Sequence, residues 1–265
     1  MTVIASNVSA IRAQNAASQA NKGLAQAMER LSTGKRINSA KDDAAGLAIA
    51  TKMTAEVRGL SAARRNANDG ISMTQTAEGA LGDISNMIQR MKELSIQAAN
   101  GTNDTAARDN LQTEVTALLA QVDKVAAQKF NGVALFGSTT NIQVGTTATD
   151  QVAITTTATD STTLAINAVN VSTGAAAAMP LLDTALNTVA TARANLGATQ
   201  SRLDSAVSNL SSTITNLSDA KSRIEDADFS EESTALAKNQ ILSQASTAML
   251  AQANQSQQGV LSLLR

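Results

Sequence analysis

The chain has 265 residues, a formal net charge of -1 and 51 alanines, about a fifth of its length, but no histidine, cysteine, tryptophan or tyrosine. Without cysteine or histidine, thiolate and imidazole zinc sites, disulfides, and Ser-His-Asp or Cys-His catalysis are excluded. Aromatic residues make up 1% of the chain, so stacking platforms for nucleic acid are missing, and no basic excess attracts a polyanion. We therefore expect no enzyme, no cofactor, no metal and no nucleic-acid partner, but long helices.

The sequence predicts neither a cleavable signal peptide nor a membrane-spanning segment. The first twenty residues lack the basic start and the apolar run of a cleavable signal peptide. No run of about 18 apolar residues occurs, so we expect no membrane insertion. A cytoplasmic protein and a protein exported without a cleaved signal both remain compatible with these features.

Apolar residues at steps of three and four predict a long helix near residues 40–100 and a shorter helix near residues 104–129. Asn100-Gly101 is typical of a helix end, and Asn103 or Asp104 can cap the shorter helix. The stripe of the first helix comprises Met53, Val57, Leu60, Leu81, Ile84, Ile88, Met91 and Leu94. That of the second comprises Leu111, Val115, Leu118, Val122 and Val125.

A third helix is predicted near residues 176–226, with Pro180 in its first turn. Its apolar residues recur at steps of seven, as in a coiled coil: Leu182, Val189, Leu196, Leu203, Leu210, Leu217 and Ile224. None of the three helices can bury its apolar stripe without packing against another helix. We therefore predict a mainly α fold, a long antiparallel coiled-coil bundle formed by residues 40–130 and 176–227.

Residues 131–175 have a different composition. Phe130-Asn131-Gly132-Val133 predicts a β-hairpin turn, and residues 142–144, 152–154 and 164–166 look like short alternating strands. Threonine fills 12 of the 36 positions from Ser138 to Thr173. We interpret this stretch as a small β-hairpin region on the surface, with O-linked glycan attachment as the alternative.

The two ends combine helical spacing with very little charge. Residues 1–28 contain only Arg12 and Lys22 as charged residues, and residues 233–264 contain only Lys238. Helices facing solvent normally display charge opposite their apolar stripe. We interpret the ends as helices that order when they pack against other copies, the alternative being two ordinary helices of a monomer. The residues assigned to this packing are Ile4, Val8, Ile11, Leu24, Leu31, Ile241, Met249, Val260, Leu261 and Leu264.

An acidic cluster at residues 225–232 has no glycine turn of the kind that a calcium loop requires. We expect instead that Ser230 caps a helix, with Glu231 and Glu232 in its first turn.

Three strings resemble bacterial flagellin: Leu31–Ala50, Arg65–Leu81 and Ser222–Arg265. The resemblance implies a discontinuous terminal domain, residues 1–39 and 228–265, that forms the tube of a filament. It implies a coiled-coil domain, residues 40–130 and 176–227, and a short variable region, residues 131–175. It further implies an extracellular filament subunit used for motility, exported by the flagellar type III apparatus without signal cleavage.

The partners implied by the resemblance are other flagellin subunits, an export chaperone, the filament cap, hook-junction proteins and Toll-like receptor 5. The residues that match the family's receptor contact are Gln89, Arg90, Glu93, Leu94 and Glu114. The competing interpretation places Leu94 in the helical seam and Arg90 on a solvated surface. Two alternatives to a filament subunit remain: a hook–filament junction protein and a non-polymerising helical binding module.

Overall fold

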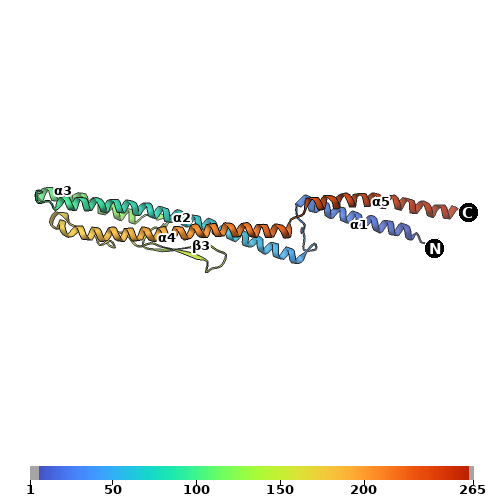
Figure 1. Ribbon diagram of the computed structural model, residues 1–265, viewed down its shortest axis with the longest axis horizontal. Helices are drawn as coiled ribbons and strands as arrows, with labels where there is room; N and C mark the ends of the chain where they lie inside the picture. The colour runs from blue at the N-terminus through green and yellow to red at the C-terminus, as the bar shows by residue number, and fades with distance from the viewer. Residues whose placement is uncertain (1–5, 263–265) are drawn as a thin grey trace. The chain divides into compact units, whose positions relative to one another are not determined.

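The computed structural model describes the backbone of residues 6–262 and the side chains of residues 6–259 (Figure 1). Helices and strands follow in the order α1 (Val8–Thr33), α2 (Ala44–Ala98), α3 (Thr105–Ala126), β1 (Lys129–Phe130), β2 (Val133–Ala134), β3 (Thr139–Gln143), β4 (Gln151–Thr155), α4 (Val171–Glu225) and α5 (Phe229–Ser262). The mainly helical fold expected from the sequence is confirmed. No helix among the described residues has the length and apolarity needed to cross a membrane.

The chain forms two compact units. One comprises residues 1–55 and 216–265, and the other comprises residues 56–215. Both long helices, α2 and α4, contribute to both units. Residues 39 and 228, the predicted domain limits, lie at the breaks between helices, before α2 and before α5, and the predicted division into a terminal and a coiled-coil domain stays a prediction.

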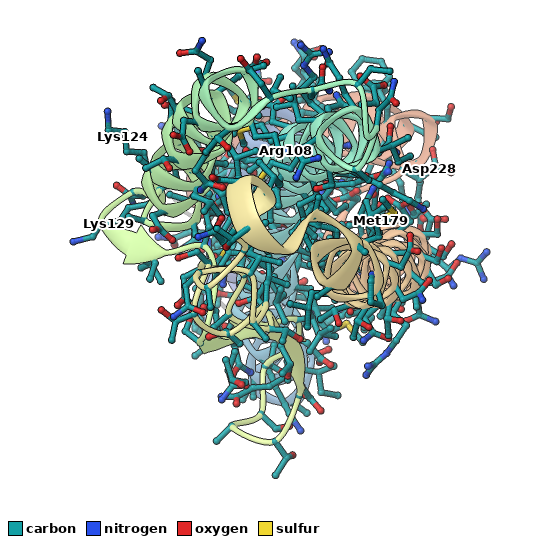
Figure 2. All side chains as sticks on the ribbon, turned by 90° about the vertical axis from the view of Figure 1, so that its left-hand side faces the viewer. Arg108, Lys124, Lys129, Met179 and Asp228 are labelled. Carbon is teal, nitrogen blue, oxygen red and sulfur yellow. The ribbon has the colours of Figure 1, made fainter. Side chains whose placement is uncertain are left out.

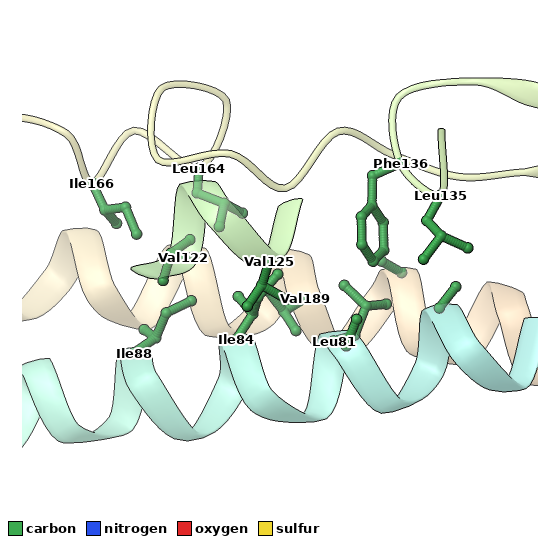
Figure 3. Packing of buried hydrophobic residues seen from close by; sticks show 14 of the residues in the cluster. Leu81, Ile84, Ile88, Val122, Val125, Leu135, Phe136, Leu164, Ile166 and Val189 are labelled. Atoms are coloured by element: carbon green, nitrogen blue, oxygen red, sulfur yellow. The ribbon is translucent and has the colours of Figure 1, made fainter. Parts of the chain in front are cut away.

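Residues 56–215 form an antiparallel bundle around one apolar core. Lys92 forms an ion pair with Asp183, and Arg193 approaches Glu78 at 3.4 Å, so α2 and α4 run in opposite directions. The core includes Leu81, Ile84, Ile88, Met91 and Leu94 of α2, Val115, Val122 and Val125 of α3, and Leu182, Val189, Leu196 and Leu203 of α4 (Figure 3). The three predicted stripes therefore meet over most of their length. The residues of the stripes that are not part of this core are Met53, Val57, Leu60, Leu210, Leu217 and Ile224. Charged side chains such as Lys124 and Lys129 extend outward (Figure 2).

Capping confirms one predicted helix start. The carboxylate of Asp104 accepts a hydrogen bond from the backbone N–H of Ala107 at 2.8 Å, so Asp104 is the cap of α3. The start of α4 differs from the prediction. The helix begins at Val171, has a kink at Gly174 (φ -134°, ψ 36°), and contains Pro180 in its interior. Pro180 was expected in the first turn, which is wrong because the chain becomes helical before the kink.

The β region confirms the predicted turn at Asn131-Gly132. Phe130 pairs with Val133, and both turn residues have positive φ, 47° and 82°, as a tight hairpin turn requires. Strands β3 and β4 form a second antiparallel pair, with Ile142 opposite Val152.

The prediction of a strand at residues 164–166 is wrong. This segment is a turn in which Ala165 has a φ of 56°. The carboxylate of Asp123 on α3 accepts hydrogen bonds from the N–H and the hydroxyl of Ser161 at 2.8 and 3.0 Å. These bonds hold the turn against α3, where Leu164 and Ile166 enter the core (Figure 3). Burial of these two side chains thus occurs without a strand.

Candidate assembly surface on the terminal helices

Helices α1 and α5 lie side by side as an antiparallel pair (Figure 1). The side-chain amide of Asn7, which also caps α1, donates to the carbonyl of Ala253 at 3.1 Å. Further along, the hydroxyl of Ser243 donates to the side chain of Asn21 at 2.9 Å. The register is thus fixed by polar contacts that join the start of α1 to the far part of α5.

A salt bridge closes the other end of the pair. The guanidinium of Arg30 lies 2.8 Å from the carboxylate of Glu232. The two side chains are 25% and 11% exposed, so this ion pair is better shielded from solvent than the others in the described part of the chain. It connects the last turn of α1 to the first turn of α5.

The seam between α1 and α5 consists of small residues. Ala13, Ala20 and Ala27 are buried at intervals of seven, and Ala253 and Ser246 are buried on the opposite helix. Near Gly23 the helices are so close that an added Cβ would lie 2.7 Å from the amide nitrogen of Asn239. Small side chains permit this approach, but each buries little apolar area, so the seam contributes only a modest hydrophobic stabilisation.

Large apolar side chains are also exposed on the same two helices. Those that are exposed are Val8, Ile11 and Met28 on α1, and Phe229, Ile241, Leu242 and Met249 on α5. Their exposed fractions range from 45% to 73%, whereas a surface helix of a globular protein normally turns its large apolar residues toward the core. We call this set the apolar band. The surroundings of the band are mainly uncharged, because these helices carry alanine, serine, asparagine and glutamine but few charged residues.

The residues assigned to packing from the sequence fall into three groups. Val8, Ile11, Ile241 and Met249 belong to the apolar band, and Leu24 and Leu31 are half-buried. Val260 and Leu261 lie in α5 beyond the described side chains, while Ile4 and Leu264 lie outside the described residues.

Sequence reasoning missed the alanine seam and part of the apolar band. Phe229 and Leu242 are 73% and 45% exposed, and neither was assigned to packing. The recurrence of Ala13, Ala20 and Ala27 at steps of seven is visible in the sequence. Alanine is so frequent in this chain that its recurrence alone does not distinguish a buried seam from an exposed face.

A shallow hollow of about 360 Å³ lies between the two helices. Its lining residues are Ser9, Arg12, Ala13, Ala16, Ala245, Ser246 and Met249. Apart from Arg12, the lining is uncharged, so the hollow suits an apolar side chain better than an ionic ligand.

The segments that join these helices to α2 and α4 pair with each other. The backbone N–H of Arg36 donates to the carbonyl of Glu225 at 2.7 Å, and that of Ala227 donates to the carbonyl of Gly34 at 3.0 Å. The Lys35 ammonium, which forms a hydrogen-bonded ion pair with Glu225, lowers the pKa of that carboxyl below its ordinary value. We call this pairing the connector.

The cap of α5 corrects a prediction. The carboxylate of Asp228 accepts from the N–H groups of Ser230 and Glu231 at 2.8 and 3.4 Å, so Asp228 rather than Ser230 is the capping residue. Asp228 precedes the helix by one residue and has a free carboxylate, which is the geometry that a cap needs. Glu231 and Glu232 do lie in the first turn.

The residues that match a receptor contact lie on α2 and α3. Arg90 donates to Glu114 at 2.9 Å and to Glu93 at 3.1 Å, and these bonds raise the pKa of Arg90. Gln89 is exposed beside them. Leu94 differs, because it is 1% exposed and belongs to the core. It cannot enter a pocket of a partner without leaving the bundle, so its interpretation as a residue of the seam is the one that fits.

Two family models match the chain. The bacterial flagellin N-terminal helical region matches residues 4–141, and the bacterial flagellin C-terminal helical region matches residues 179–264. The flagellin of Xenorhabdus nematophila is 43% identical over 311 aligned positions, which cover 100% of this chain and 99% of that protein. The flagellin of Bacillus subtilis (strain 168) is 39% identical, with 98% of each chain covered.

Other flagellins are covered only in part. A flagellin of Salmonella muenchen is 48% identical over 155 positions, which span 57% of this chain and 31% of that protein. In the crystal structure of Bacillus cereus flagellin, 94% of the chain superposes on 59% of this one, with a TM-score of 0.51 and 32% identity.

Helical fold and family matches together define a structural protein of the bacterial flagellum. The chain belongs to the bacterial flagellin family. It is accordingly a structural subunit of the extracellular flagellar filament. No finding favours a hook–filament junction protein or a non-polymerising helical module.

Proposed function

We propose that this chain assembles into the filament through the apolar band of α1 and α5, with a second copy of the chain as the occupant. The observation that carries the proposal is the exposure of large apolar side chains on both terminal helices, 54% for Ile11 and 66% for Ile241. In a monomer this surface would remain in water, whereas burial against a neighbouring copy removes it.

We infer that the contact joins different surfaces of the two copies. A filament grows when one surface of a subunit packs on a different surface of the next, so that the contact repeats without closing into a small ring. The exposed residues Ile241 and Phe229 of the apolar band offer one surface, and the hollow at Ala13 and Ala16 offers another, with Met249 belonging to both.

We also propose that the terminal helices become fully ordered only when the chain assembles. The α1–α5 seam buries alanine and serine, which contribute little to the free energy of folding, so the pair is marginal in the free chain. Contact with neighbouring copies supplies the missing burial. Far-ultraviolet circular dichroism should therefore show helicity that rises on polymerisation, and unchanged helicity would argue against this step.

A charge placed in the apolar band tests the surface directly. Ile241→Asp puts a carboxylate where a neighbour would bury the side chain, and filament seeds should no longer be extended. Leu181→Asp is the matched control, because Leu181 is exposed on α4, outside the terminal helices. Equal extension by both variants would contradict the proposed surface.

The remaining partners follow from family membership. We propose export by the flagellar type III apparatus without signal cleavage, with an export chaperone, the filament cap and hook-junction proteins as partners. Mass spectrometry of intact subunits from filaments tests the export step, since cleavage of a signal would shorten the N-terminal peptide.

Recognition by Toll-like receptor 5 is proposed for Gln89, Arg90, Glu93 and Glu114, without Leu94. The exposure of these four side chains supports the proposal, as does the pairing of the Arg90 guanidinium with the carboxylates of Glu93 and Glu114. Leu94 remains a core residue that keeps α2 in place.

A further inference from the structure

The chain contains eight methionines and no cysteine, so thioethers are its only sulfur groups. Tryptophan, tyrosine and histidine are also absent, which leaves no indole, phenol or imidazole to compete for an oxidant. Methionine is converted to its sulfoxide by mild oxidants, and exposure decides which residues react. An oxidant that reaches this protein therefore acts on its methionines.

The described methionines differ widely in exposure. Met28 is 55% exposed and Met249 is 64% exposed. By contrast, Met73 and Met91 are 4% and 0% exposed and belong to the core. The others, Met53, Met87 and Met179, are half-buried. Both exposed methionines thus lie on the terminal helices, one on α1 and one on α5.

Their surroundings connect oxidation with assembly. Met28 follows Ala27 of the seam, and Met249 lines the hollow between the helices together with Ala16 and Ala245. Both side chains belong to the apolar band, which the proposed function buries against a neighbouring copy. A sulfoxide makes a flexible apolar side chain polar, and it adds an oxygen that needs a hydrogen-bond donor when it is buried.

We propose that Met28 and Met249 are peroxide modification sites whose sulfoxides prevent the free chain from joining a filament. In the reaction the thioether sulfur attacks one oxygen of hydrogen peroxide. A sulfur–oxygen bond forms, the oxygen–oxygen bond breaks, and the second oxygen leaves as water with both hydrogens. Sulfur loses two electrons and peroxide gains them. The effect on assembly rests on the proposed function, whereas the selectivity of the modification rests on exposure alone.

Selectivity is tested on the free chain. Monomer is treated with hydrogen peroxide, and peptide mass spectrometry follows the sulfoxide at each methionine over time. Met28 and Met249 should react at least about tenfold faster than Met73 and Met91. Equal rates at exposed and core methionines would overturn the proposal without touching the proposed function.

The effect on assembly is tested with filament seeds. Peroxide treatment should raise the critical concentration of the wild-type chain at least about tenfold, the equivalent of one weakened contact. For the double variant M28L/M249L, which conserves side-chain volume, the critical concentration after the same treatment should equal that of the untreated double variant, whatever the effect of the substitutions themselves. The matched control M53L/M179L keeps both proposed sites and should remain sensitive. Equal sensitivity of M28L/M249L and wild type would overturn the proposal.

The oxidation rates of methionines in assembled filaments provide an independent test. If the apolar band is buried between copies, Met28 and Met249 should react at least about tenfold more slowly in filaments than in monomer. Rates unchanged by assembly would overturn the proposal. Failure of the untreated wild-type chain to extend seeds would instead contradict the proposed function, and the monomer rates would still decide the selectivity.

Discussion

The ammonium nitrogen of Lys35 lies 2.5 Å from a carboxylate oxygen of Glu225, and this ion pair joins the segment after α1 to the end of α4. Lys221 approaches the other carboxylate oxygen at 3.5 Å. The residue Glu225 is 7% exposed, so its charge is held by these two cations rather than by solvent. Two backbone hydrogen bonds of the connector flank the pair.

The connector should weaken in acid. The pKa of Glu225 in the folded chain is lowered from 4.5, chiefly by the hydrogen bond from Lys35. Its contribution to stability is therefore complete above the unfolded pKa and is lost as the pH falls through the lowered folded value. Hydrogen-exchange protection factors of the Arg36 and Ala227 amides should fall over that acidic range. In Glu225→Gln they should be lower at neutral pH and should lose this pH dependence, whereas an unchanged acidic slope would contradict the role of Glu225.

Truncation of a core residue should destabilise the bundle formed by residues 56–215. Leu203 is fully buried on α4, so Leu203→Ala removes apolar contacts and leaves a cavity. The free energy of unfolding in urea should fall by about 2–5 kcal/mol. Leu181→Ala, at a position 39% exposed on the same helix, should cost much less. Similar losses for both variants would show that Leu203 does not belong to a packed core.

Enlargement of a seam residue should separate α1 from α5. Ala20 is 4% exposed where the two helices approach closely, so Ala20→Leu forces them apart. The free energy of opening of α1, measured by hydrogen exchange, should fall by about 1–3 kcal/mol. Ala25→Leu adds the same volume at an exposed position of α1 and serves as the control. If the amides of α1 are equally protected from hydrogen exchange in both variants, the seam does not pass through Ala20.

Removal of the Arg90 side chain should separate stability from receptor recognition. Arg90 is exposed, and its ion pairs with Glu93 and Glu114 are solvated, so Arg90→Ala should leave the unfolding midpoint unchanged. Activation of receptor-reporter cells should fall at least about tenfold, since an arginine at a contact is costly to lose. The exposed Arg58 on the same helix gives the control variant Arg58→Ala. Full activation by Arg90→Ala would refute the receptor proposal.

The helices of residues 56–215 could be predicted because their information is local and periodic. Leu81, Ile84 and Ile88 recur at three and four, and Leu182, Val189 and Leu196 recur at seven; each set is buried in the core. The turn at Asn131-Gly132 was equally predictable, because few other dipeptides tolerate positive φ at both positions.

The predictions that were wrong or left open concern residues whose positions depend on contacts between distant parts of the chain. Alternation at Leu164 and Ile166 resembles a strand, but the hydrogen bonds between Asp123 and Ser161 fix a turn instead. The burial of Leu94 was open from the sequence alone, since a helix residue can face either the seam or a partner. The candidate assembly surface could be located at the chain ends from their low charge, but the choice between Ala20 in the seam and Ile241 outside it required the pairing of α1 with α5.

We propose above that assembly proceeds through the terminal helix pair. Seeded polymerisation of the full chain, compared with a variant that lacks residues 1–28, tests it most directly, with filament length followed by electron microscopy. The deletion removes most of α1, including Val8 and Ile11, and leaves the bundle of residues 56–215 intact. We predict that the full chain extends the seeds and the truncated chain does not. Equal extension by the truncated chain would contradict assembly through the terminal helices.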